Sequence, residues 1–188
     1  MNIAVAFIPL AWLIFIGYWV FSSFGIKRDI ARVPLWRAWW LRMALAIFFL
    51  ATALNAAPEG SFVRHWFTLR STSYIILADI LVAAGIALSI WARVHIGRNW
   101  SPAPALKEEH ELITSGPYAY VRHPIYTGII LAALGSVLVN PGWAIVLIFV
   151  VGMFLWRVKR EEALMLQEFP SQYPEYMKKT WALIPFIY

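Results

Sequence analysis

The chain has 188 residues, of which 61% are hydrophobic and 14% charged, with a net charge of +6 and no cysteine. Soluble globular proteins are about 45–50% apolar and about 25% charged, so this composition indicates an integral membrane protein. The lack of cysteine excludes disulfides, thiolate nucleophiles and cysteine metal sites, and four scattered histidines do not favour a zinc site. Basic residues lie between apolar segments, which favours contact with lipid headgroups over nucleic acid.

Three apolar runs in the first half of the chain are long enough to cross a bilayer: residues 3–24, 39–57 and 72–94. About 20 apolar residues span a hydrocarbon core of about 30 Å. The first run has no basic segment before it and no small-residue cleavage pattern after it, so we expect a retained span rather than a signal peptide. In the third run, Asp79 fits either a polar lining residue or a position near the outer interface. Arg93 is expected to extend toward the headgroups.

A polar connection over residues 95–124 leads to two shorter apolar runs, which flank the turn signal Asn140-Pro141-Gly142. The first run, residues 125–139, would form a helix of only about 22 Å, and its small residues permit close helix packing. The second continues from Trp143 to Trp156 and then becomes charged, which predicts one long helix that leaves the membrane.

These runs predict an all-α, polytopic integral membrane protein with about five transmembrane helices and a C-terminal helical hairpin. We divide the chain into three N-terminal transmembrane helices, residues 1–94, and a C-terminal catalytic region, residues 95–188. Lysine and arginine concentrate in residues 25–42, in 95–124 and after 156. Five spans place these segments on one side, which the positive-inside rule makes cytoplasmic.

The segment from Gly116 to Gly128 carries the densest polar pattern. Proline suits the first turn of a helix, because its missing N–H would have no partner there. Pro124 is therefore predicted to open the fourth span, with Arg122 and His123 just before it and His123 outside the packed apolar core. A helix N-terminus favours a carboxylate ligand, and Gly128 allows close backbone approach. Ionisable groups at a membrane edge are functional-site candidates, with a snorkelling basic cap as the alternative.

A second polar cluster begins where the last long helix leaves the membrane. Arg157 and Glu161 are four residues apart and share a helix face, with Glu162 beside them. An ordinary solvated salt bridge is the alternative to a functional role. The predicted topology places this cluster level with residues 95–128. The aromatic and basic tail that follows either lies on the lipid surface or folds back as a lid over the polar site.

Together these residues resemble the isoprenylcysteine carboxyl methyltransferase family, within the wider group that includes phospholipid methyltransferases. The resemblance covers about residues 95–188 in order and spacing, whereas the first 94 residues match only as generic spans. The matching pieces are His110-Glu-Leu-Ile113, Ser115-Gly-Pro-Tyr118, Arg122-His-Pro-Ile-Tyr126-Thr-Gly128, Arg157 with Glu161-Glu162, Tyr173-x-x-Tyr176-x-Lys-Lys179 and Leu183-Ile-Pro-Phe186.

The resemblance implies S-adenosylmethionine as cofactor, held by the C-terminal half in a cytoplasmic pocket rather than by a Rossmann domain, and no metal. It implies catalytic roles for Arg157 and Glu161, and acceptor contacts from Asn99, Trp100 and Arg157. The cofactor-binding residues that it implies are His110, Glu111, Leu112, Ile113, Tyr118, Arg122, His123, Pro124, Ile125, Tyr126, Gly128, Glu161 and Glu162.

The activity that follows is methyl transfer to a lipidic or prenylated acceptor from the bilayer, with an isoprenylcysteine carboxylate favoured. A phospholipid, an isoprenoid or a small apolar amine or thiol is an alternative acceptor. A membrane reductase of the sterol-reductase kind, which uses NADPH, is a second alternative. A non-enzymatic transporter or scaffold is the third, and only Asp79 and Arg93 favour it.

Overall fold

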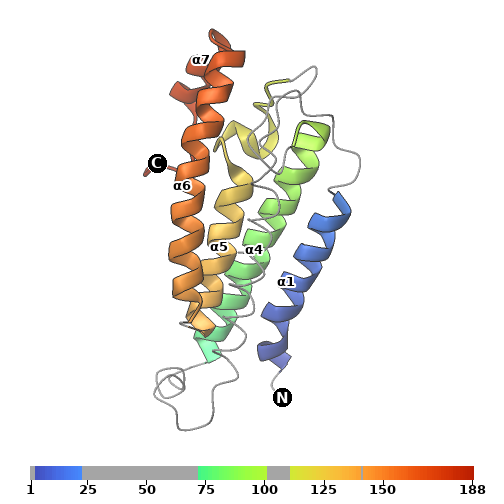
Figure 1. Cartoon of the computed structure of the whole chain (residues 1–188). Coiled ribbons are helices and arrows are strands. Elements are labelled where there is room, and N and C mark those ends of the chain that lie inside the picture. Colours follow the sequence, from blue (N-terminus) through green and yellow to red (C-terminus); the bar gives the residue numbers. More distant parts are fainter. Residues whose placement is uncertain (1–2, 23–71, 101–110, 141) are drawn as a thin grey trace.

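The computed structural model describes residues 3–22, 72–100, 111–140 and 142–188, and these form an elongated helical bundle (Figure 1). The predicted span over residues 39–57 lies outside this part of the chain. The described helices are α1 (Ile3–Ser22), α4 (Thr72–Ile96), α5 (Pro124–Val139), α6 (Trp143–Glu168) and α7 (Gln172–Lys179), with short 3-10 turns at Gly97–Asn99 and Gly116–Ala119. Within the described ranges there is no β-strand, only one isolated bridge, so the all-α prediction is confirmed there.

Several predicted boundaries are confirmed. Pro124 is the first residue of α5, and α6 runs without a break from the apolar run into the charged segment. Asn140 follows the last residue of α5. Its side-chain oxygen accepts a hydrogen bond from the backbone N–H of Gly142 at 3.0 Å. Thr72–Asn99 is the one helix of the described residues that is long and apolar enough to cross a membrane, and Phe7–Ser22 and Pro124–Val139 are shorter apolar helices. The number of spans stays a prediction.

Helices α4 and α5 approach closely through small residues. A Cβ atom added to Gly128 would lie 2.9 Å from the backbone nitrogen of Ser89, and one added to Gly135 would lie 2.8 Å from the carbonyl oxygen of Ala78. Real Cβ atoms do not come so near backbone atoms, so only glycine permits this spacing. The predicted close packing is confirmed, and its partner is α4.

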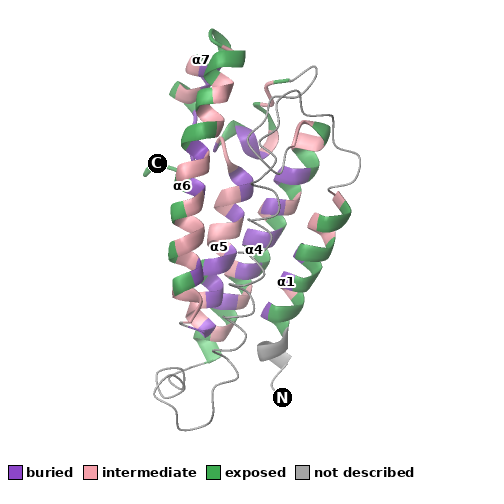
Figure 2. Ribbon diagram, viewed as in Figure 1, coloured by how far each residue is buried: buried purple, intermediate pink, exposed green. Residues whose placement is uncertain are grey.

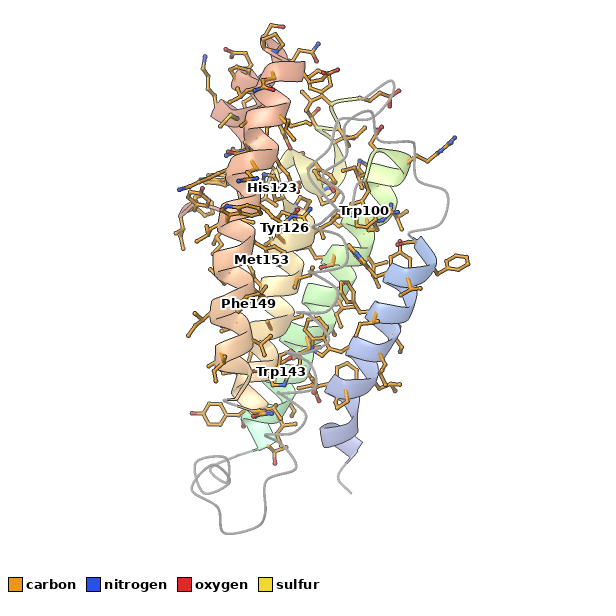
Figure 3. The ribbon with its side chains drawn as sticks, in the orientation of Figure 1. Trp100, His123, Tyr126, Trp143, Phe149 and Met153 are labelled. Atoms are coloured by element: carbon orange, nitrogen blue, oxygen red, sulfur yellow. The ribbon has the colours of Figure 1, made fainter. Side chains whose placement is uncertain are left out.

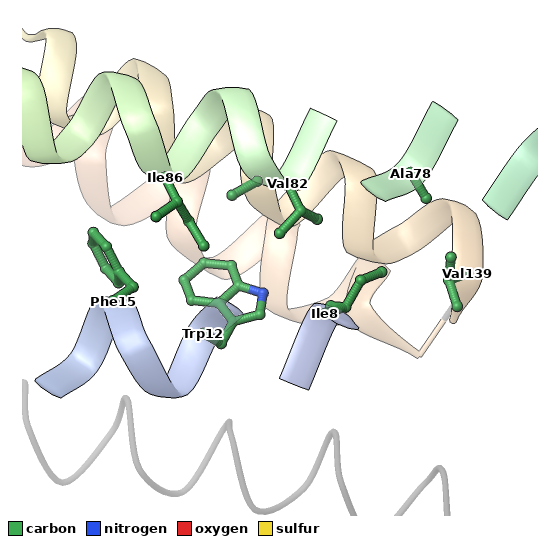
Figure 4. Close-up of a cluster of buried hydrophobic side chains, with 8 residues drawn as sticks. Ile8, Trp12, Phe15, Ala78, Val82, Ile86 and Val139 are labelled. Atoms are coloured by element: carbon green, nitrogen blue, oxygen red, sulfur yellow. The ribbon is translucent and has the colours of Figure 1, made fainter. Parts of the chain in front are cut away.

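Aromatic side chains join α1 to the other helices (Figure 4). The Trp12 ring stacks on Trp143 with ring centroids 5.4 Å apart, and its indole N–H donates to the Ser136 hydroxyl at 3.0 Å. A buried indole N–H needs such a partner. Buried residues gather along the facing sides of α4 and α5, and the outward faces are exposed (Figure 2), as expected for helices whose outer side contacts lipid.

Arg93 differs from its prediction. The side chain is buried, donates to the carbonyl oxygens of Gly97 and Ser22, and lies over the Trp100 ring at 4.5 Å. Ser22 is the last residue of α1, and a cation suits the partial negative charge of a helix C-terminus. Arg93 therefore joins the ends of α1 and α4 instead of extending toward the headgroups, which corrects the expectation. Asp79 is half-buried near the opposite end of α4.

Candidate functional site at the start of α5

The two predicted polar clusters meet at the end of the bundle where α5 begins. Figure 3 shows His123 and Tyr126 at the start of α5. They lie between α6 and the end of α4 beside which Trp100 is labelled. His123 precedes Pro124, the first residue of α5, as predicted. Its ring is largely buried, with 10% of the side chain exposed, and it stacks parallel to Tyr126 at 5.5 Å. His123 belongs to none of the apolar clusters of the described residues, as predicted, but it is withdrawn from water in a polar network.

The Glu161 carboxylate accepts hydrogen bonds from a residue of α5 and from a residue of α6, the helix that carries Glu161. The guanidinium of Arg157 donates from Nε and Nη2 to Glu161 Oε1 at 3.2 and 2.8 Å, and the Tyr126 hydroxyl donates to the same oxygen at 2.7 Å. Only 11% of the Arg157 side chain and 20% of the Glu161 side chain are exposed. A solvated surface salt bridge is therefore excluded for this pair, since both groups are largely removed from water.

Glu162 is held by the segment before α5. Arg122 Nε donates to Glu162 Oε1 at 2.6 Å, with 9% and 14% of the two side chains exposed. His123 lies between the two carboxylates, with Nδ1 3.5 Å from Glu161 and Nε2 3.5 Å from Glu162. Two segments about 40 residues apart in sequence thus form one buried network of alternating charges.

Mutual pairing sets the protonation states of this network. Burial opposes ionisation of Glu161, but Arg157, His123 and Tyr126 outweigh it and lower the pKa of Glu161 to about 2. Burial likewise opposes the charge of His123, yet the hydrogen-bonding and charge interactions with Glu161 and Glu162 raise the pKa of His123 above its usual value. The pKa of Glu162 is lowered because His123 and Arg122 outweigh the opposing effect of burial. Ionised carboxylates and a readily protonated histidine therefore coexist away from water.

The tail after α7 folds back along this segment, as one of its two predicted placements requires, whereas its role as a lid over the polar site stays a prediction. Val121 and Trp181 form a parallel bridge, and the N–H groups of Arg122 and His123 donate to the carbonyls of Trp181 and Ala182 at 2.8 and 3.0 Å. The Arg122 guanidinium also donates to the carbonyl of Thr180. The backbone that presents Arg122 and His123 is thus fixed by the tail.

Three supporting contacts were not predicted from the sequence. Thr127 donates its hydroxyl to the Leu183 carbonyl at 2.6 Å, Phe154 stacks on Tyr126 at 4.2 Å, and the Tyr176 hydroxyl donates to the Tyr118 carbonyl at 2.6 Å. Thr127 and Tyr176 belong to motifs that the sequence analysis quoted, but Phe154 does not. Nothing in the sequence indicates these contacts, because each joins segments far apart along the chain.

The other predicted site residues lie around this network at different depths. Tyr118 and Ile125 are buried with Ala92 in an apolar cluster against which Ile113 and Trp100 pack. Leu112 is half-buried, Glu111 is exposed, and His110 lies outside the described residues. Of the remaining predicted residues, Asn99 is the last residue of the 3-10 turn after α4, Pro124 is buried at the start of α5, and Gly128 lies against α4.

The network fits a small zwitterionic ligand that carries a carboxylate and an ammonium group. It offers two arginines for a carboxylate and two glutamates for an ammonium group, all partly removed from water. The buried Nε2 atom of His123 makes no close hydrogen bond among the described residues, and the Glu162 carboxylate lies 3.5 Å from it. A buried polar atom with so long a contact has capacity for a ligand or water. No group of three metal-ligating side chains occurs in the described ranges.

Comparison with known proteins identifies a set of similar membrane methyltransferases. The family model for isoprenylcysteine carboxyl methyltransferase (ICMT) matches residues 76–167. The chain is 31% identical over 167 residues to protein-S-isoprenylcysteine O-methyltransferase of Schizosaccharomyces pombe, covering 80% of this chain and 68% of that protein. It is 30% identical over 184 residues to a probable protein-S-isoprenylcysteine O-methyltransferase of Oryza sativa subsp. indica, covering 94% and 93%.

Among solved structures, the eukaryotic intramembrane Ras methyltransferase ICMT superposes with a TM-score of 0.58 at 23% identity. The alignment covers 82% of this chain and 55% of that structure, so the chain spans about half the length of that enzyme. At this identity the likeness establishes the shared fold.

Proposed function

The chain belongs to the isoprenylcysteine carboxyl methyltransferase family, and we propose that it transfers the methyl group of S-adenosylmethionine to the carboxylate of an isoprenylcysteine-type acceptor in the membrane. The observation that carries the proposal is the buried network of Arg122, His123, Arg157, Glu161 and Glu162, at the end of an apolar bundle. Buried charges of this kind are costly and mark functional sites in membrane proteins.

The donor side of the proposed site is the segment from Arg122 to Tyr126 together with Glu161 and Glu162. S-Adenosylmethionine supplies an electrophilic methyl group on a cationic sulfur. Glu162 and Glu161 offer carboxylates to the donor's ammonium group, and Nε2 of His123, which makes no close hydrogen bond, offers a polar contact nearby. Tyr126, stacked between His123 and Phe154, holds Glu161 in place.

We assign the acceptor side to Arg157, together with Asn99 and Trp100, which follow α4. A guanidinium binds a carboxylate through two parallel hydrogen bonds, and Arg157 is held in place by Glu161 and by the Tyr126 ring, 5.4 Å from its guanidinium carbon. An anionic acceptor and a cationic donor lose charge when the methyl group transfers, which a site with little water favours. Catalysis then rests on alignment of the two reactants, without a protein nucleophile.

We place the site on the cytoplasmic side, because it is built from the two basic segments 95–124 and after 156, and the positive-inside rule assigns these there. A prenylated acceptor enters from the bilayer, whereas the donor enters from water. Reactants of such different solubility account for a charged site at the very end of an apolar bundle.

The test is methyl transfer from labelled S-adenosylmethionine to a panel of acceptors: N-acetyl-farnesylcysteine, its methyl ester, phosphatidylethanolamine and an alkyl thiol. We expect base-labile label on the free farnesylcysteine and none on its ester. Binding of S-adenosylhomocysteine to the purified protein is measured in parallel, with NADPH as the comparison ligand. Transfer to the amine or thiol alone would refute the proposed acceptor, and failure of a folded protein to bind S-adenosylhomocysteine would refute the donor.

A further inference from the structure

The last residues of the chain expose large apolar side chains beside a polar site. Phe186 is 86% exposed and Ile187 is 78% exposed, and Ile184, Trp181 and Tyr188 are exposed beside them. The rings of Trp181 and Phe186 contact each other with centroids 4.7 Å apart. Contiguous exposed apolar groups of this kind mark an interaction surface. We call residues 181 and 184–188 the tail patch.

The outward direction of the tail patch is built into its backbone. Phe186 has a φ of 68°, a left-handed conformation that is unfavourable for a bulky side chain. The turn around it is closed by hydrogen bonds from the N–H groups of Ile187 and Tyr188 to the Ile184 carbonyl at 3.1 and 3.0 Å. The fold therefore holds Phe186 and Ile187 outward at an energetic cost, instead of burying them.

Packing fixes the level of the tail patch along α6. Ala182 and Leu183, which come directly before Ile184, are almost fully buried against Val158 of α6, with Ile130 of α5 beside them. Figure 1 shows the C-terminal end beside α6, well below α7. The tail patch thus leaves the fold next to residue 158.

The same level of α6 is where its apolar outer face ends. Ile145, Ile148 and Leu155 are exposed on one face of α6, and Lys159 follows on that face. The Arg160 guanidinium lies 4.2 Å from the centre of the Trp156 ring. Aromatic rings with basic side chains are typical of the boundary between acyl chains and headgroups.

We propose that the tail patch is seated in the headgroup region of the bilayer, with its apolar side chains among the upper acyl chains and Lys159 and Arg160 against anionic headgroups. The tail patch leaves the fold at the level where the exposed apolar face of α6 ends, and the basic side chains at that level complement an acidic leaflet. The carbonyls of Trp181 and Ala182 accept hydrogen bonds from the backbone N–H groups of Arg122 and His123. The position of the tail patch in the bilayer therefore also fixes the depth of the polar network relative to the membrane.

The absence of cysteine from the chain allows a direct test. Single variants Ile187→Cys and Phe186→Cys carry a nitroxide, and the full chain is placed in nanodiscs of phosphatidylcholine with phosphatidylserine. Gln172→Cys, at the exposed start of α7, is the reference for water, and Ile148→Cys, exposed on α6, is the reference for acyl chains. Collision rates with oxygen and with a water-soluble nickel chelate give the depth of each label.

We expect the labels at residues 186 and 187 to lie about 5–10 Å inside the boundary, between the depths at residues 148 and 172. Chelate accessibility equal to that at Gln172 would overturn the proposal, because the tail patch would then be in water. Protection from both oxygen and chelate would also overturn it, since a second copy or another protein would then cover the tail patch. Replacing Lys159 and Arg160 by glutamine should reduce the added depth that phosphatidylserine gives, and an unchanged response would refute the headgroup contact. Unchanged circular dichroism and elution volume show that each variant is folded.

Discussion

Gly128→Ala is the most direct test of the packing that positions the site. The added methyl group would collide with the backbone of Gly85 and Ser89 on α4, where the distance to the Ser89 nitrogen is 2.9 Å. Backbone atoms cannot rotate away as a side chain can, so α4 and α5 must separate. Because α5 carries His123 and Tyr126 at its start, this separation also shifts the donor side of the site.

The size of the effect follows from two opposing contributions. Alanine is favoured over glycine inside a helix by about 1 kcal/mol, whereas an extra methyl group in a packed interior costs about 1–3 kcal/mol. The clash at Gly128 is with backbone, so the upper part of that range applies. We expect a net loss of about 1–2 kcal/mol in the free energy of unfolding.

Gly152→Ala is the matched control, because Gly152 lies in α6 and a Cβ there meets nothing within 4 Å. This variant should gain stability by up to about 1 kcal/mol. Thermal unfolding in detergent, followed by tryptophan fluorescence, reports both variants, with about 2–4 °C expected per kcal/mol for a chain of this size. A Gly128→Ala protein at least as stable as wild type, with unchanged S-adenosylhomocysteine affinity, would refute the close crossing of α4 and α5.

The other predictions concern the network and the core. His123→Ala should weaken S-adenosylhomocysteine binding and lower the melting temperature, because two buried carboxylates lose a shared partner; unchanged affinity by calorimetry would place the donor elsewhere. Glu161→Gln should lower the pKa of His123. A histidine with a raised pKa stabilises the fold fully below its usual value of 6.5 and loses this contribution as the pH rises through the raised value. Above the usual value, the fall in melting temperature should therefore be smaller in the variant and complete at lower pH than in wild type, and coincident profiles would contradict the pairing. Arg157→Lys removes the planar fork and should raise the acceptor KM more than it weakens donor binding; equal losses would make Arg157 only a brace for Glu161. Trp12→Phe removes the hydrogen bond to Ser136 and should cost about 1 kcal/mol in a thermal melt, with turnover unchanged.

Much of the local architecture was predictable from the sequence. Pro124 marks the start of α5, Asn140 and Gly142 mark the turn of the hairpin, and α6 continues unbroken through the change from apolar to charged residues after Trp156. These features depend on chain chemistry within one or two helical turns. The approach of the two polar clusters was also predictable, since alternation of spans and the positions of basic residues place both at one end of the bundle.

The structure alone decided which groups pair there. Arg122 binds Glu162, whereas Arg157 and Tyr126 bind Glu161. The sequence does not distinguish the partners of these two neighbouring glutamates, because the partners depend on how α6 is rotated against α5. The burial of Arg93 depends on where α1 ends in space, and the burial of His123 depends on how α6 packs against α5. The return of the tail depends on backbone hydrogen bonds at residues 121–123 and 181–182. Every residue type except proline can donate such bonds, so no pattern of side chains records them, and only the packed fold fixes their partners.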